Sequence, residues 1–171
     1  MLKQSNLNEN LNKLKGPKYL VCFLIGLCTL IYAGISIPAR LTFSPTDSVG
    51  YRLFFIRGGN ADHLKKNDYI TFPLYTKIVP GCWPCTVVKK IVCVEGDNLV
   101  VNHRNFFCNK KYIGTAKTHS KKGIPVKTFD YNGVVPTGKL FVMGTCIDSY
   151  DSRYFGFIDQ KQVTAVVIPI L

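Results

Sequence analysis

The stretch that decides the fold is TVVKKIVCV, residues 86–94. It is rich in β-branched residues, which favour strands, and successive side chains of a strand point to opposite faces of a sheet. Lys89 and Lys90 must therefore face different sides, and the lysine that faces inward is desolvated. The pattern predicts a strand with one buried lysine but leaves open which lysine it is. The alternative is an edge strand that keeps its lysines in water.

Short segments of similar character recur along the chain, and residues typical of turns separate them. The other candidate strands are Tyr51–Arg57, Tyr69–Phe72, Leu99–Asn102, Leu140–Met143 and Val163–Ile168. No long segment after residue 38 has the 3.6-residue periodicity of an amphipathic helix. We therefore expect residues 39–171 to form a mainly β, barrel-like domain. Its Lys-rich residues 103–135 would form an extended excursion or a small β subdomain.

An uncharged apolar segment, YLVCFLIGLCTLIYAGISI at residues 19–37, precedes this domain. As a helix rising about 1.5 Å per residue it would span about 28 Å, close to the ~30 Å hydrocarbon core of a bilayer. A cleaved secretory signal is the alternative, but it normally has a shorter apolar region followed by a small-residue cleavage site. No such site follows here, so we expect residues 19–38 to form a single transmembrane anchor.

The chain is strongly basic, with a net charge of +12 from 22 basic and 10 acidic residues. It contains no nucleic-acid-binding motif, so the charge favours anionic membrane lipid as a partner and no nucleic acid. Lysines in the basic tail, residues 1–18, precede the apolar segment more densely than arginines follow it. The positive-inside rule then predicts a cytoplasmic N-terminus and export of residues 39–171.

Five of the seven cysteines follow the apolar segment, in a part expected to be exported: Cys82, Cys85, Cys93, Cys108 and Cys146. Disulfides form outside the cytoplasm, and an odd number leaves at least one thiol over. Cys82 and Cys85 have the spacing of a redox motif, although no βαβ pattern surrounds them. Disulfides, free thiols and a redox or metal site all stay open. The three histidines lack ligand spacing, so we expect no metal and no cofactor.

Ser48 is a candidate nucleophile in the turn-prone segment SPTDSVG, residues 44–50. Such a serine can equally be an ordinary turn residue. The chain has no G-x-S-x-G motif and no histidine with an evident carboxylate partner, which argues against a Ser-His-Asp triad. A buried lysine offers another base, because desolvation lowers its pKa and a neutral amine can accept the serine proton.

Three blocks resemble the type I signal peptidase family in order and spacing. They are Thr46-Asp47-Ser48 after the apolar segment, KKIVCVEGD at residues 89–97, and GTCIDSYDSRYFG at residues 144–156. The last two resemble the family patterns K-R-V-x-x-x-P-G-D and G-D-N…S-x-D-S-R-Y-x-G. The resemblance covers residues 19–171. It implies a signal-peptidase or LexA-like β peptidase domain behind one N-terminal transmembrane helix, in the bacterial inner membrane with the domain on the periplasmic side.

The resemblance also implies the catalytic roles. Ser48 would be the nucleophile and Lys89, the first lysine of the pair, its general base. The hydroxyl of Thr46 and the backbone N–H of Ser48 would stabilise the oxyanion, which needs preorganised donors.

Three further residues would support the site. Ser149 would orient the Lys89 amine, and Asp151 and Arg153 would form an ion pair that fixes the Ser149 loop. The family has Asp-Asn where this chain has Thr145-Cys146, so the support of that loop is expected to differ.

The function implied is a membrane-bound serine endopeptidase that cleaves signal or leader peptides of exported precursors. The short chain and the SYDSRYFG run, residues 149–156, resemble conjugative-transfer peptidases of the TraF type, which points to a propilin substrate. One alternative is a LexA-like self-cleaving regulator, which would need a DNA-binding domain in place of the apolar segment. The other is a catalytically inactive, membrane-tethered β module for envelope or conjugation-apparatus assembly.

Overall fold

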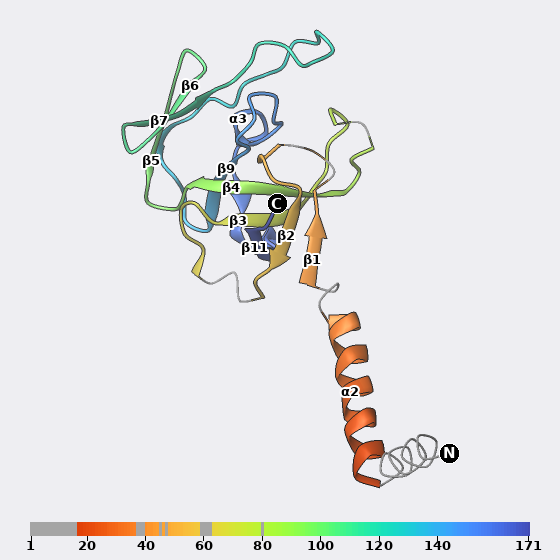
Figure 1. Cartoon of the computed structure of the whole chain (residues 1–171). Helices are drawn as coiled ribbons and strands as arrows, with labels where there is room; N and C mark the ends of the chain where they lie inside the picture. Colours follow the sequence, from red (N-terminus) through yellow and green to blue (C-terminus); the bar gives the residue numbers. More distant parts are fainter. Residues whose placement is uncertain (1–16, 37–39, 45, 47, 59–62, 80) are drawn as a thin grey trace, which may run out of the picture. The chain divides into compact units, whose positions relative to one another are not determined.

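A computed structural model describes residues 17–36, 40–44, 46, 48–58, 63–79 and 81–171 (Figure 1). The chain divides into two compact units, Met1–Arg40 and Leu41–Leu171. Most of the predicted basic tail, the predicted end of the anchor at residue 38, and Asp47 lie outside the described residues.

The first unit contains helix α2 (Pro17–Ser36). Its stretch Lys18–Ser36 has a mean hydropathy of 2.1, and none of it is buried. Large apolar side chains such as Phe23 and Leu30 are mostly exposed. By length and composition this helix can cross a membrane, as the apolar sequence predicts.

The second unit is built on antiparallel strands, which confirms the mainly β fold class. A seven-stranded sheet has, in spatial order, β1 (Leu41–Phe43), β2 (Leu53–Ile56), β11 (Ala165–Pro169), β3 (Tyr69–Leu74), β4 (Cys85–Cys93), β9 (Lys139–Met143) and β10 (Ile158–Asp159). A four-stranded sheet has β7 (Lys111–Thr115), β6 (Asn105–Cys108), β5 (Asn98–Asn102) and β8 (Asn132–Val134). The helix α3 (Ser152–Phe155) and the 3-10 turn Gln160–Gln162 complete the described elements of this unit.

Strand β4 lies between β3 and β9 and is an interior strand, so the edge-strand alternative is wrong. Its alternating side chains enter two different hydrophobic clusters. Ile91 packs with Ile70 and Phe72 in one cluster, and Val88 packs with Phe54 in another. The predicted alternation therefore holds from Val87 to Ile91 and places Lys89 on the face of Ile91. It breaks at a bulge between Ile91 and Cys93, so that Val92 and Cys93 both pack in a third cluster.

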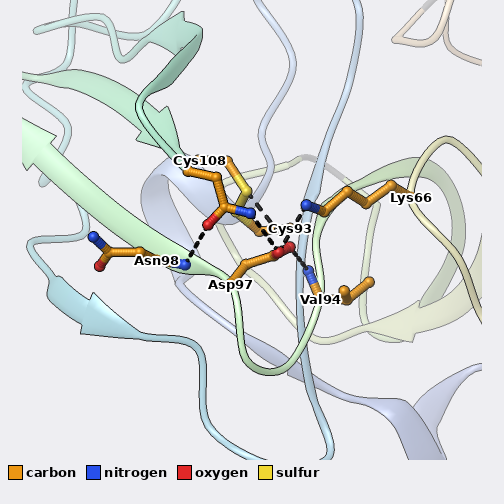
Figure 2. The surroundings of a disulfide bond; sticks show 7 residues. Lys66, Cys93, Val94, Asp97, Asn98 and Cys108 are labelled. Carbon is orange, nitrogen blue, oxygen red and sulfur yellow. Dashed lines mark hydrogen bonds and ion pairs between the residues drawn. A yellow bond between two sulfur atoms is a disulfide. The ribbon is translucent and has the colours of Figure 1, made fainter.

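The two sheets are joined at the end of β4, where a disulfide links Cys93 to Cys108 at the end of β6 (Figure 2). Beside it, the buried Asp97 carboxylate accepts hydrogen bonds from Lys66 Nζ at 2.7 Å and from the Val94 amide at 2.8 Å. Asn109 Nδ2 donates a third, at 2.7 Å. Burial alone would raise the pKa of Asp97, but these donors lower it overall. A satisfied carboxylate therefore fixes the turn between β4 and β5.

A second disulfide, Cys82–Cys85, closes the connection between β3 and β4. Cys146 takes part in neither of the two disulfides. The structure thus pairs Cys82 with Cys85 in a disulfide, so the free-thiol alternative does not hold for these two residues.

The two disulfides should contribute differently to stability, because a cross-link restricts the unfolded chain more when it closes a longer loop. Cys93 and Cys108 are 15 residues apart and Cys82 and Cys85 are 3 apart. We expect the double variant Cys93→Ala/Cys108→Ala to lose about 3 kcal/mol and Cys82→Ala/Cys85→Ala about 2 kcal/mol. Urea unfolding of the full chain in detergent measures both. A larger loss from the Cys82/Cys85 variant would contradict this ranking.

Candidate active site

Ser48 lies in the loop between β1 and β2. The loop is closed by the Ser44 amide, which donates to the Arg52 carbonyl at 2.8 Å. Val49 is fully buried against Phe54 and Val88, so it anchors the loop to the sheet. Ser48 itself is half-buried. The Ser44 hydrogen bond before Ser48 and the buried Val49 after it thus attach this loop to the sheet.

Lys89 is the buried lysine, with 3% of its surface exposed. Its Nζ donates to Ser149 Oγ at 2.8 Å. Burial lowers its pKa to about 8, with Arg153 adding to the decrease and the charge of Asp151 opposing it. Lys90 is only half-buried and lies 5.9 Å from the centroid of the Tyr69 ring.

The Asp151 carboxylate organises the loop that carries Ser149. Asp151 is completely buried and caps α3, where its Oδ1 accepts the Arg153 amide at 3.2 Å. Arg153 binds it in a two-pronged manner, Nε to Oδ1 and Nη2 to Oδ2, both at 2.8 Å. Oδ2 also accepts the Gly144 amide at 2.8 Å. The carboxylate therefore ties together both ends of the segment from Gly144 to Arg153.

The Arg153 guanidinium has donors left over, and these bind backbone carbonyls around it. Nη2 donates to the carbonyls of Cys146 and Ser149, both at 3.3 Å. Nη1 donates to the Thr115 carbonyl at 2.9 Å, which is at the end of β7. The ion pair thus holds the Ser149 loop and connects it to β7 of the second sheet.

Gly144 is where the Ser48 loop and the Ser149 loop meet. A Cβ atom added to Gly144 would lie 2.2 Å from Ser149 Oγ and 2.4 Å from the Ser48 carbonyl oxygen. The Cys146 amide also donates to the Ser48 carbonyl, at 3.2 Å. The missing side chain lets the hydroxyl that binds Lys89 approach the backbone of Ser48.

Thr46 and the Ser48 hydroxyl, also predicted from sequence, are not hydrogen-bonded to Lys89, Ser149, Asp151 or Arg153 in the described part of the chain. Thr46 is exposed, and its hydroxyl donates to Ser48 Oγ at 3.4 Å. Among the described residues, no hydrogen bond joins the Ser48 hydroxyl directly to Lys89 Nζ. The structure therefore groups Lys89, Ser149, Asp151 and Arg153 closely and brings Ser48 to them through Gly144.

Sequence reasoning missed Gly144 and Ser152 as parts of this site. Ser152 is fully buried, and its Oγ accepts the Val142 amide at 2.9 Å. Both residues lie inside the third resemblance block. Their presence there was a usable signal, but nothing in the sequence says which backbone groups they meet.

Comparison with known proteins identifies the family. The family model described as signal peptidase, peptidase S26, matches residues 18–171. The chain therefore belongs to the peptidase S26 family of signal peptidases. Membership of this family implies serine-type endopeptidase activity. The substrates of such an enzyme are precursors that carry signal peptides.

The curated proteins give no match. Among solved structures, a signal peptidase I from Enterococcus faecalis V583 is 23% identical, with a TM-score of 0.42 over 63% of this chain and 98% of that one.

Replacement of Gly144 tests the geometry of this junction. In Gly144→Ala the new methyl group would overlap Ser149 Oγ and the Ser48 carbonyl, so one loop must move. We expect peptide cleavage to fall by about a hundredfold or more, as when a preorganised catalytic group is misplaced. Gly26→Ala, where the added Cβ meets nothing within 4 Å, is the matched control. Full activity in folded Gly144→Ala would contradict the close approach of the two loops.

Proposed function

We propose that this chain cleaves signal or leader peptides of exported precursors with Ser48 as nucleophile and Lys89 as general base. The observation that carries the proposal is the buried Lys89 amine, whose pKa is lowered to about 8 and whose Nζ is aimed by Ser149. Such burial has a cost for a lysine, since desolvation penalises its charged form. Perturbed titrating groups of this kind gather at active sites.

The lowered pKa makes the base available near neutrality. At pH 7 an amine of pKa about 8 is neutral in about a tenth of the molecules, compared with fewer than about one in a thousand at the ordinary value. The neutral Lys89 amine takes the Ser48 proton as Ser48 Oγ attacks the scissile carbonyl. The ammonium then protonates the leaving amine, and water resolves the acyl-enzyme. Catalytic hydrogen bonds that are long without substrate tighten when it binds.

The oxyanion of the tetrahedral intermediate needs donors already in place. The backbone N–H of Ser48 and the Thr46 hydroxyl are the candidates, and the hydroxyl already lies 3.4 Å from Ser48 Oγ. Loss of one such donor typically costs about a hundredfold to a thousandfold in rate. Ser149, Asp151 and Arg153 act on the reaction by holding Lys89 and its loop.

The substrate would bind in an extended conformation beside the Ser48 loop and β4, with small residues such as alanine at the first and third positions before the cleaved bond. Extended binding supplies main-chain hydrogen bonds, and side-chain pockets supply selectivity. A propilin used in conjugation is the particular precursor we propose, on the resemblance of residues 149–156 to the TraF type.

The proposed site faces the outside of the bacterial inner membrane. With α2 as a single-pass anchor and the Lys-rich tail in the cytoplasm, residues 39–171 would be periplasmic. A reporter enzyme fused after Leu171 should then be active only if it is of the type that works outside the cytoplasm. Activity of a cytoplasmic reporter at the same position would refute this orientation.

Two adjacent lysines allow a matched test of the base. We expect Lys89→Ala to abolish cleavage as fully as Ser48→Ala does, because members of one catalytic unit are not additive. Lys90→Ala should keep most activity, since the half-buried Lys90 points to the other face. Initial rates on a pre-protein measure both variants, and Ser48→Ala also separates an enzyme from an inactive assembly module. Full activity in Lys89→Ala would exclude the proposed pair.

A further inference from the structure

A pocket of about 580 Å³ lies on the second sheet, outside the site described above. One wall is the two-residue turn between β5 and β6, His103 and Arg104, both of which have positive φ. A second wall is the segment from Thr115 to Ser120, which follows β7. The remaining lining residue is Ile147, in the Ser149 loop.

The lining of this pocket is basic. It includes Arg104, Lys117, His103 and His119, and no acidic residue is among the lining residues. Arg104 is held by backbone carbonyls: Nε donates to Ala116 at 3.0 Å, and Nη2 contacts the Lys117 carbonyl. These partners fix the guanidinium without cancelling its charge.

The segment that supplies most of the lining is basic as a whole. Residues 98–135 contain seven lysines and arginines against one acidic residue, Asp130, and so hold half of the chain's net charge of +12. Lys117 and Lys121 share a single carboxylate, Asp148, so one positive charge remains there. A cleft lined by charge of one sign attracts ligands of the opposite sign.

Chain connectivity brings the pocket close to Ser48. Ile147 is 56% exposed and directly follows Cys146, whose amide donates to the Ser48 carbonyl. An extended peptide advances about 3.3 Å per residue. A peptide cut at Ser48 therefore reaches the pocket within a few residues of the cleaved bond.

We propose that this basic pocket binds a carboxylate side chain in the mature part of the precursor, just after the cleaved bond. The proposal rests on the proposed function. The ligand must come from the mature side, because a signal peptide has a positively charged first region and an apolar second region. The pocket would thus select acidic residues among the first positions of the product.

The test uses the full chain in neutral-lipid nanodiscs and paired peptides that carry Asp or Asn at one of the first five positions after the cleaved bond. We expect Asp to raise kcat/KM about threefold to tenfold at its best position, through KM, and high salt to remove most of the gain. Thr118→Glu places a carboxylate in the exposed pocket lining and should abolish the preference. Thr137→Glu, also exposed but outside the pocket, is the matched control and should keep it.

Three outcomes would overturn the proposal. The first is equal kcat/KM for the Asp and Asn peptides at all five positions, and the second is a preference for Asp that persists in Thr118→Glu. The third is an effect of Thr118→Glu that is equal for both peptides and is seen only with added phosphatidylglycerol. The last would assign the pocket to lipid phosphate. Binding of the same labelled peptides to Ser48→Ala gives an independent measure. If the wild type cleaves no peptide, the proposed function fails, and the Asp-to-Asn binding ratio still decides the role of the pocket.

Discussion

The buried ion pair between Asp151 and Arg153 is the interaction on which the arrangement around Ser48 depends. Together the two side chains bind Gly144, Cys146, Ser149 and Thr115 through backbone groups. Removing one partner of a buried pair typically costs about 3–5 kcal/mol, because the other charge is left without compensation. In this chain the loss would destabilise the loop that carries Ser149, whose hydroxyl accepts the hydrogen bond from Lys89.

The same pair also influences the pKa of the Lys89 amine. Asp151 alone would favour the ammonium form, whereas Arg153 disfavours it. Burial is the largest influence on the pKa of Lys89, and these two charges act on it in opposite directions. Loss of Arg153 would therefore remove hydrogen bonds to this loop and would also raise the pKa of Lys89.

The segment between β7 and β8 also contacts α3. The Phe129 amide donates to the Arg153 carbonyl at 2.8 Å, and the Lys117 amide donates to the Tyr154 hydroxyl at 3.0 Å. Phe106 stacks on Phe141 of β9 across the junction, at 5.6 Å between ring centroids. The second sheet and the segment that follows β7 are thus linked by these contacts to α3 and β9, next to the residues that contact Lys89.

Much of the first sheet could be predicted from sequence, since alternating apolar runs such as that of β4 specify strands and faces directly. In the second sheet, β5 was predicted as Leu99–Asn102, and β6, β7 and β8 form the small β subdomain that was one of the two expectations for residues 103–135. The individual strands β6 and β7 could not be predicted, because they are short and their turns use non-glycine residues at positive φ, including Arg104 and Lys110. Periodicity could not choose between Lys89 and Lys90, and only the family motif did so before the structure. The role of Gly144 could not be predicted either, because it depends on the close approach of the Ser48 and Ser149 loops, which are far apart in the sequence.

Labelling of Ser48 with a serine-directed fluorophosphonate, followed by mass spectrometry of the modified peptide, tests the central claim most directly. If neutral Lys89 activates Ser48, the adduct should form on Ser48, its rate should rise with pH with a midpoint near the Lys89 pKa of about 8, and Lys89→Ala should lose it. Labelling of Ser48 that is equally fast in Lys89→Ala, or that does not change with pH, would contradict the account.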